Sequence, residues 1–402
     1  MFAIKKRNFL FLLVVAILTG AIIPAAAAAI FRAWTDTGPP VTKQEYDEYV
    51  GLKANYAKLK DLENYVNDNY YLPIDAKTLE EGTYKGLFGG VGDPYTVYYT
   101  ESEFTKMHEE MDGEFYGIGA VLGSDEEGNL VAVEVLSGSA AESAGLQAGD
   151  IFLSIDGKSY KGEAVSEAVD HLRGQEGTEV EVRVQRAEEI FERKLIRAGV
   201  ILPSVVSSMI EGSNLAYIRI LSFASHTAED FRAELTKMEE ANPRGLVIDL
   251  RNNPGGMVDK GVEIADMLLD GGTVATAKYK DGSEEVYKTS DGRTGLPYVI
   301  LVNGASASTS EILAGAVQDN KGGVLIGAVT IGKGIIQKLE QFSDGDGARI
   351  TVAQYVRPGG AVVQGVGVTP DYVVENSIEG GDVQLNKAVE LLSQDASNAG
   401  GL

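Results

Sequence analysis

The residues best suited to chemistry lie in two loops of the carboxyl-terminal half. The first loop reads NGASASTSE and carries Ser306, Ser308 and Ser310 directly before an expected helix. A serine at such a point is a candidate nucleophile. The S-x-x-E spacing from Ser308 to Glu311 also matches a capping box, in which the serine only satisfies amides of the first helical turn. Taken alone, this loop favours the cap.

A serine nucleophile needs a base, and the usual base is histidine. The chain has three histidines, and none lies near the serine loop in sequence. His226, at an expected junction between a strand and a helix, is a minor candidate. His108 and His171 belong to other parts of the chain. The sequence therefore directs attention to other residue types.

The second loop, GAVTIGKGIIQ, carries one lysine, Lys333. A lysine is a base only when its amine is neutral, and lowering its pKa from about 10.4 to 7 or 8 requires about 3 to 5 kcal/mol. Burial against Ile331, Ile335 and Ile336 could supply this free energy. Gln337 follows Lys333 at a spacing that shares a face in a helix or a strand, so its amide could hold the amine in line.

Composition excludes several other chemistries. The 402 residues contain no cysteine, which removes disulfides, thiolate zinc sites, iron–sulfur clusters and a cysteine nucleophile. Neither a metal nor another cofactor is expected. A phosphate-binding loop is disfavoured because Gly334 stands where G-x-x-x-x-G-K needs serine or threonine next. The formal charge of −24 would repel nucleic acid, which is therefore not an expected partner.

Strands alternating with helices must position the two loops. Continuous apolar strands of this kind indicate an α/β layer with a buried sheet, whose sites form beyond the carboxyl ends of the strands. Expected strands cover residues 215–220, 246–250, 298–302 and 324–326, and expected helices cover 228–240, 258–269 and 311–319. The loops that follow these strands are 251–256, 303–309 and 327–334.

A different pattern, of short alternating strands, occupies residues 113–198. Expected strands cover 120–122, 131–135, 151–155 and 180–184, and the stretch SGSAAESAGLQAGDIFLSIDG combines a short helix, glycine turns and a strand. This region resembles a PDZ domain. The resemblance implies that Tyr116, Gly117, Ile118 and Gly119 bind the terminal carboxylate of an extended peptide. A tight turn is the alternative role of the two glycines.

The amino terminus has the composition of an export signal. Lys5, Lys6 and Arg7 precede an apolar run that extends to Phe31. Two outcomes stay open, because the alanines at 25–29 offer cleavage sites whereas residues 9–31 are long enough to remain as a membrane anchor. In both cases we expect an exported protein, at the outer face of the cytoplasmic membrane or in a periplasmic or extracellular location.

The motifs together resemble one family. GASASTSEI, GKGIIQ, IDLRNNPGG and the preceding PDZ-like region are similar to the carboxyl-terminal processing proteases, also called tail-specific proteases, from about residue 45 to residue 374. The resemblance implies a serine endopeptidase with Ser308 as nucleophile, Lys333 as general base and Gln337 as the residue that orients the lysine. It also implies oxyanion-hole amides at Gly255 and Thr309.

The same resemblance implies the fold class and the organisation. We expect an α/β protein with a core similar to the Clp protease and crotonase fold. Taken with its other domains, the chain as a whole would be an α+β multidomain protein. Its parts would be a signal peptide or anchor at 1–35, a helical dimerisation region at 42–112, a PDZ domain at 113–198, a protease core at 199–375 and a tail with a short helix at 376–402. Expected partners are peptide or protein substrates with free carboxyl termini and a second copy of the chain.

Two other functions stay open from the sequence. The PDZ-like region could capture tails for a scaffold whose core is catalytically idle, or the core could hydrolyse a non-peptide ester or amide. Arg173, in a late polar turn of the PDZ-like region, is a candidate sensor that contacts the core, with a solvated surface arginine as the alternative. Thr309 and Ile331 depart from the alanine and phenylalanine common in the family, but they change no reacting group.

Overall fold

The computed structural model describes residues 6–35, 42–375 and 381–395. The chain divides into two compact units, residues 1–82 and 83–402, and each is described by itself. Lys5 of the export signal, and residues 376–380 and 396–402 of the predicted tail, lie outside the described residues. The domain limits predicted from the sequence stay predictions.

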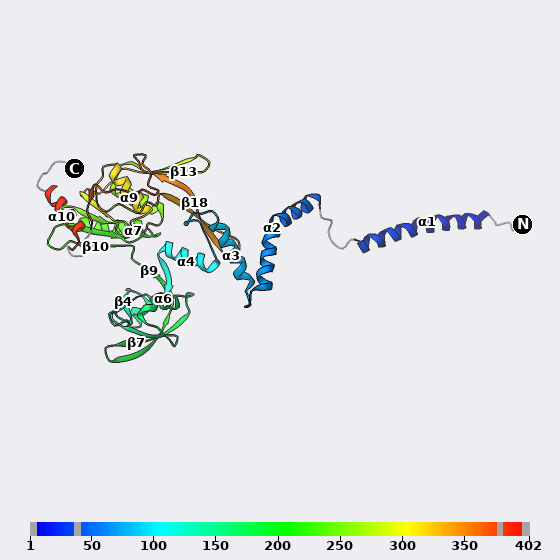
Figure 1. Cartoon of the computed structure of the whole chain (residues 1–402), viewed down its shortest axis with the longest axis horizontal. Coiled ribbons are helices and arrows are strands. Elements are labelled where there is room, and N and C mark those ends of the chain that lie inside the picture. The colour runs from blue at the N-terminus through cyan, green and yellow to red at the C-terminus, as the bar shows by residue number, and fades with distance from the viewer. Residues whose placement is uncertain (1–5, 36–41, 376–380, 396–402) are drawn as a thin grey trace. The chain divides into compact units, whose positions relative to one another are not determined.

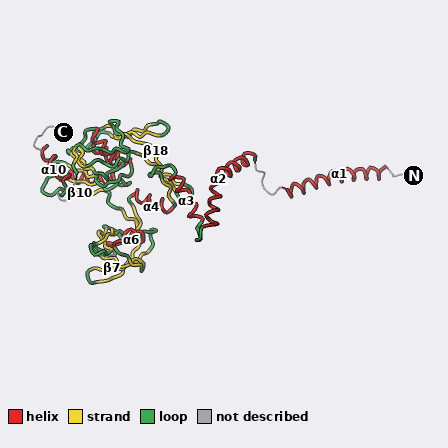
Figure 2. Tube along the Cα trace, in the orientation of Figure 1, coloured by secondary structure: helices red, strands yellow, loops and turns green. Residues whose placement is uncertain are grey.

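Helices make up the amino-terminal unit (Figures 1 and 2). Helix α1 covers Lys6–Thr35, and its stretch Lys6–Ala28 is long and apolar enough to cross a membrane, with a mean hydropathy of 2.6. Length and composition fit a signal peptide and an anchor equally. Helix α2, Lys43–Asn69, begins at a capping box formed by Thr42 and Glu45 and has no buried residue. Helix α3, Ala76–Gly89, runs on into the second unit.

The PDZ-like region has its own sheet and core within the second unit. The sheet order is β3-β4-β5-β7-β8, with β6 on β5. Its elements are β3 Ala120–Ser124, β4 Leu130–Val135, α5 Ala140–Ser143, β5 Ile151–Ile155, β6 Lys158–Ser159, η1 Gly162–Ala164, α6 Val165–Leu172, β7 Glu179–Arg186 and β8 Glu189–Ile196. The antiparallel strands β2 (Glu114–Gly117) and β9 (Ala198–Ile201) connect this region to the preceding and the following parts of the chain. Alternating burial along β7 shows one face in the core, as the sequence pattern indicates.

The main sheet of the second unit has the order β10-β11-β12-β15-β16-β19. Only the β10–β11 pair is antiparallel among these neighbours. The strands are β10 Val205–Met209, β11 Ala216–Ile220, β12 Leu246–Asp249, β15 Tyr298–Val302, β16 Val324–Gly327 and β19 Tyr372–Val373, and the helices are α7 Thr227–Glu240, α8 Val258–Leu268, α9 Thr309–Asp319 and α10 Val383–Asp395. The expected α/β layer is confirmed.

Alternate residues of this sheet pack on opposite sides. Leu246 and Ile248 join a core with residues of α7, α8 and α9, whereas Val247 packs with Ala388 and Leu392 of α10. Buried apolar residues on both faces explain why the strands read as continuous apolar runs. The parallel strands also place the ends of β12, β15 and β16 at one edge, where the three predicted loops begin.

A second sheet was not predicted from the sequence. Its order is β1-β18-β13-β14, with β17 also paired to β18, and its strands are β1 Val97–Tyr99, β13 Gly272–Tyr279, β14 Glu284–Thr289, β17 Ile335–Gln341 and β18 Gly347–Val356. The strand β1, followed by helix α4 (Glu101–Asp112), lies within the region 42–112, in which helices and no strand were expected. Three residues are too few to show a periodicity, and pairing with β18 makes them a strand.

Candidate active site

Ser308 occupies a strained turn between β15 and α9. Its φ of +54° and ψ of −115° lie outside the regions that residues with a side chain normally adopt. All of β15 is buried, as is most of α9, so the surrounding core holds the serine in this conformation. The residue is only 9% exposed. Strain maintained by packing in this way is typical of functional sites.

The neighbouring hydroxyls of the loop serve the structure. Ser306 donates to the carbonyl of Leu250 (2.8 Å), Thr309 to that of Gly256 (2.8 Å) and Ser310 to that of Asn253 (3.0 Å). The side chain of Ser308 pairs with the N–H of Glu311 in the predicted capping box. Among the residues that the structure describes, no acceptor is found for the proton of its hydroxyl. Its proton is therefore available for transfer to a base.

The carboxylate of Glu311 links this serine to the lysine loop. It is fully buried and accepts from the N–H of Ser308 at 2.8 Å, which forms part of the predicted capping box. It also accepts from the N–H groups of Gly332 (2.8 Å) and Lys333 (2.9 Å) and from the hydroxyl of Thr330. The N–H of Glu311 itself donates to the carbonyl of Ser308 at 2.8 Å. The first turn of α9 thus has a backbone hydrogen bond that does not need the serine hydroxyl.

Tyr355 on β18 joins the same two loops from the second sheet. Its buried hydroxyl lies 3.2 Å from the carbonyl oxygen of Ser308 and 3.3 Å from that of Lys333, and it is shared between them. Burial raises the pKa of Tyr355, and the carboxylate of Glu311 raises it further. The hydroxyl therefore stays protonated and remains a donor. The backbones of residues 308 and 333 are fixed relative to each other.

The environment of Lys333 favours a neutral amine. Burial, and then the charge of Arg349, lowers its pKa, while the carboxylates of Asp93 and Glu311 act in the opposite direction. A lowered pKa is what a lysine base requires. However, no hydrogen bond joins Lys333 to Ser308 among the described residues, and Nζ lies 4.7 Å from the centre of the Tyr95 ring. In this arrangement the amine of Lys333 and the hydroxyl of Ser308 therefore do not form the hydrogen bond that proton transfer needs.

Gln337 also has a different partner from the one expected. It lies on β17, and its Nε2 donates to the carbonyl of Tyr95 at 2.6 Å. The pairing of β17 with β18 shifts register between Ile336 and Gln337. The extra residue at this shift is Val352 of β18, so the alternation along β17 itself is kept. The partner could not be foreseen, because Tyr95 belongs to a distant part of the sequence.

Gly255 and Thr309 are both close to the serine. A Cβ on Gly255 would lie 2.8 Å from the Cβ of Ser308 and 3.0 Å from the amide nitrogen of Thr309, and the φ of Gly255 is +97°. Only glycine fits both requirements. Thr309 begins α9, so its amide has no partner within the helix. The N–H of Gly255 donates to Oδ1 of Asn253 at 2.8 Å. Asn253, which sequence reasoning missed, therefore holds one of the two predicted oxyanion donors.

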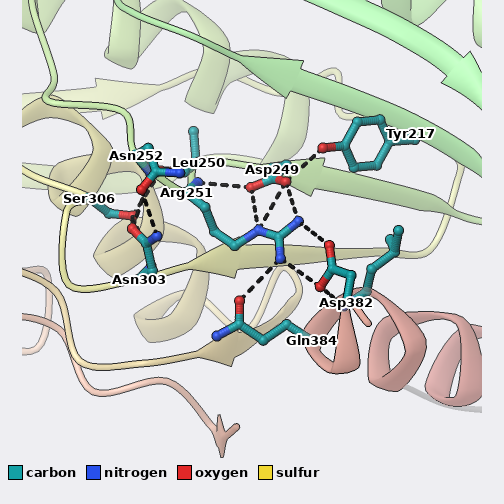
Figure 3. A network of polar contacts seen from close by, with 10 residues as sticks. Tyr217, Asp249, Leu250, Arg251, Asn252, Asn303, Ser306, Asp382 and Gln384 are labelled. Carbon is teal, nitrogen blue, oxygen red and sulfur yellow. Dashed lines mark hydrogen bonds and ion pairs between the residues drawn. The ribbon is translucent and has the colours of Figure 1, made fainter. Parts of the chain in front are cut away.

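A polar network holds the loop that carries Gly255 (Figure 3). Arg251 donates to the carboxylates of Asp249 and Asp382 at distances from 2.6 to 3.0 Å. Burial opposes the charge of Arg251, but these hydrogen bonds outweigh it and raise its pKa. Asn303 accepts from the N–H of Asn252 at 3.0 Å, and its Nδ2 donates back to the Asn252 side chain at 2.9 Å. The network ties α10 and the serine loop to the end of β12.

Three of the four predicted tail-binding residues line a cavity of about 180 Å³ in the PDZ-like region. Gly117, Ile118 and Gly119 contribute to it, and so do Leu172 and Arg173 from the end of α6. Tyr116 is not among its lining residues, and the preceding Phe115 is. The guanidinium of Arg173 lies 4.2 Å from the centre of the Phe115 ring. The structure thus places Arg173 on the wall of this cavity.

His226 lies elsewhere in the second unit. Its Nδ1 is 3.2 Å from the carbonyl oxygen of Asp112, and its Nε2 is 3.2 Å from that of Leu202. These carbonyls flank the two strands that enter and leave the PDZ-like region. The contacts of His226 are therefore structural, and they give no support to a histidine base for Ser308.

Comparisons with known proteins agree with the sequence motifs. Residues 214–374 match the model of peptidase family S41, and residues 131–186 match a PDZ domain. The chain is 32% identical over 324 residues to the carboxy-terminal processing protease CtpA of Bacillus subtilis, covering 80% of this chain and 69% of that protein. It is 31% identical over 361 residues to a carboxy-terminal-processing protease of Bartonella bacilliformis, covering 86% and 81%. A solved photosystem II D1 C-terminal processing protease is similar at 29% identity, covering 84% and 92%, with a TM-score of 0.49.

The role of Glu311 can be tested through stability. Glu311→Gln replaces one acceptor oxygen by an NH₂ group that faces N–H or O–H donors. Each buried donor left without a partner costs about 1 to 3 kcal/mol, so we expect the free energy of unfolding to fall by at least about 2 kcal/mol in urea denaturation. Glu340→Gln, at an exposed position of β17, is the matched control and should change it by less than about 0.5 kcal/mol. Equal effects of the two substitutions would contradict the linking role.

Proposed function

Because this chain belongs to the carboxy-terminal processing proteases of peptidase family S41, which are serine-type, we propose that Ser308 is its nucleophile and Lys333 its general base. The observation that carries the proposal is the buried carboxylate of Glu311, which binds the backbone N–H groups of both residues. It holds a strained serine, whose hydroxyl donates to no acceptor among the described residues, beside a lysine whose pKa is lowered. No other pair of side chains in the described residues combines these properties with the family motifs.

In the proposed mechanism, neutral Lys333 accepts the proton of Ser308 while the serine oxygen attacks a peptide carbonyl. The protonated lysine then returns the proton to the leaving amine, and an acyl-enzyme remains. Water hydrolyses it with the lysine again as base. The amides of Gly255 and Thr309 stabilise the oxyanion, and each such donor typically contributes about 2.7 to 4 kcal/mol. For this step the N–H of Gly255 must leave Oδ1 of Asn253 and bind the oxyanion. The amide of Gln337 must also leave Tyr95 and orient the amine of Lys333.

We further propose that the PDZ domain receives the carboxyl-terminal tails of substrates. Gly117, Ile118 and Gly119 lie at the cavity where a terminal carboxylate would be bound by backbone amides. Arg173 on the wall of the same cavity adds a positive charge that suits a carboxylate. We assign it the sensing role, so that a bound tail favours the active arrangement of the core. A tail can shift that equilibrium only if it binds the active arrangement more tightly.

Export completes the proposed function. The apolar helix α1 begins with the two cations Lys6 and Arg7, and this distribution of charge would keep its start in the cytoplasm. The catalytic part would then act on proteins outside the cytoplasmic membrane. The homodimer expected through residues 42–112 stays a prediction.

The dyad can be tested by two substitutions and one control. Ser308→Ala and Lys333→Ala should each lower kcat for an unfolded protein substrate by at least about 10⁴-fold, as for other paired catalytic groups. Lys338→Ala removes an exposed lysine of β17 and should leave kcat within about twofold. Products are followed by mass spectrometry. Hydrolysis that persists in Ser308→Ala would reassign the nucleophile, and tail binding without hydrolysis by the wild type would support the scaffold alternative.

The pH profile of the same reaction tests the base. A general base works only when deprotonated, so the rate of the chemical step should rise from acidic to mildly alkaline pH. Because the pKa of Lys333 is lowered, the rise should be complete below the pH at which an ordinary lysine loses its proton. Pre-steady-state acylation rates between about pH 5 and 9 measure it. A flat profile would exclude Lys333 as the base.

Tail recognition can be tested with two matched peptides. One ends in a free apolar carboxyl terminus and the other is the same peptide amidated. The wild type should cleave the free acid faster, and Arg173→Gln should reduce that preference. Arg183→Gln, on the exposed side of β7, is the control and should keep it. Equal cleavage of both peptides by the wild type would leave the PDZ domain without a role in selecting tails.

Export can be tested by cell fractionation and amino-terminal sequencing. The protein should be recovered at the outer face of the cytoplasmic membrane or beyond it. A mature terminus after the alanines at 25–29 would show cleavage, whereas an intact Lys6–Ala28 segment in the membrane fraction would show an anchor. Full-length protein in the cytosol would contradict both forms of the proposal.

A further inference from the structure

A single residue far from the catalytic motifs holds both side chains assigned to the base. The amine of Lys333 lies over the ring of Tyr95, 4.7 Å from its centre. The amide of Gln337 donates to the carbonyl of the same tyrosine at 2.6 Å. The guanidinium of Arg349 donates to that carbonyl as well, at 3.3 Å. Tyr95 thus contacts both of the side chains that the proposed mechanism brings together.

The segment that carries Tyr95 is firmly attached to β18. The carboxylate of Asp93 accepts from the N–H of Tyr95 (3.0 Å), the hydroxyl of Thr96 (2.8 Å) and the hydroxyl of Thr351 (2.6 Å). The N–H of Thr351 donates to the Thr96 hydroxyl at 3.2 Å, and strand pairing continues directly afterwards. Strand β18 also carries Tyr355, which binds the carbonyl of Lys333. The same strand therefore holds both the ring of Tyr95 and the backbone of Lys333. The contact is therefore built into the fold.

Burial and the positive charge of Arg349 favour the neutral form of Lys333, so the protonated form depends on groups that act against them. Asp93 and Glu311 present negative charges, and Arg349 presents a positive one. The face of an aromatic ring attracts a cation and has no comparable attraction for a neutral amine. Tyr95 therefore stabilises the protonated lysine, and a protonated lysine cannot take the proton of Ser308.

We propose that Tyr95 is a positioning residue for the base: its ring holds Lys333 in a protonated resting position, its carbonyl holds Gln337, and catalysis begins when both side chains leave it. This inference rests on the proposed roles of Ser308 and Lys333. It adds residues 93–96 to the machinery that controls them. In the resting arrangement the loops are already aligned, and only two side chains need to move.

Substitution of Tyr95 should shift the acidic limb of the pH profile, which is the part where the reactivity of Ser308 rises with pH. The direction of the shift should depend on the side chain that replaces the tyrosine. Tyr95→Leu removes the attraction for the cation, so the pKa of the resting lysine falls and the acidic limb should shift to lower pH by about half a unit to one unit. Tyr95→Trp strengthens the attraction and should shift the limb to higher pH. Tyr95→Phe keeps the ring face and should leave the limb in place. A purely structural role would slow the reaction without opposite shifts.

The measurement is the rate at which a fluorophosphonate labels Ser308 in the full chain, followed by mass spectrometry between about pH 5 and 9. This probe needs no tail and so bypasses the PDZ domain. Opposite shifts for the leucine and tryptophan variants support the proposal, and an unchanged limb in both overturns it. Thermal unfolding shows which variants are folded, and the phenylalanine and tryptophan variants still test the proposal if the leucine variant is not. Labelling that persists in Ser308→Ala would instead overturn the proposed nucleophile.

Discussion

One buried negative charge determines the geometry of this site. The carboxylate of Glu311 is removed from solvent, and burying a charge is costly unless hydrogen bonds compensate it. Here three backbone N–H groups and one hydroxyl compensate it, and they come from both loops that carry the proposed dyad. The fold can satisfy this carboxylate only when the turn of Ser308 and the loop of Lys333 lie together. The hydrogen bonds that this carboxylate needs therefore also hold the backbones of Ser308 and Lys333 close to each other.

The remaining contacts divide the site into a fixed backbone and movable side chains. Tyr355 binds the carbonyls of both loops, and the network around Arg251 holds the strand end that leads to Gly255. In contrast, the Lys333 amine, the Gln337 amide and the Gly255 N–H have partners other than the ones catalysis would use. Activation would therefore exchange a few polar contacts while the strands and helices stay in place. In the proposed function, a bound tail shifts this equilibrium by binding the active arrangement more tightly than the resting one.

Much of the fold could be predicted because its signals are local. Buried parallel strands such as 246–249 and 298–302 are largely apolar runs. Along β7, apolar and polar residues alternate, which indicates a sheet with one buried face. The second sheet was not predicted, although β13–β14 and β17–β18 are hairpins of neighbouring strands. Only the pairings of β18 with β1 and β13 join distant segments, and no local pattern indicates those. β1 has three residues, and only pairing with β18 makes it a strand. Its position then brings Tyr95 to Lys333, which no spacing in the sequence records.

The sequence by itself determined the family, the α/β layer and the two loops with their reactive residue types. These follow from short motifs and from periodicities that neighbouring residues express. Only the tertiary structure decided how the side chains of these loops are used. It assigned the hydroxyls of Ser306 and Ser310 to backbone carbonyls, the amide of Gln337 to Tyr95 and the N–H of Gly255 to Asn253. A hydrogen bond depends on distances of a few ångströms in space, and those distances are set by how remote segments pack together.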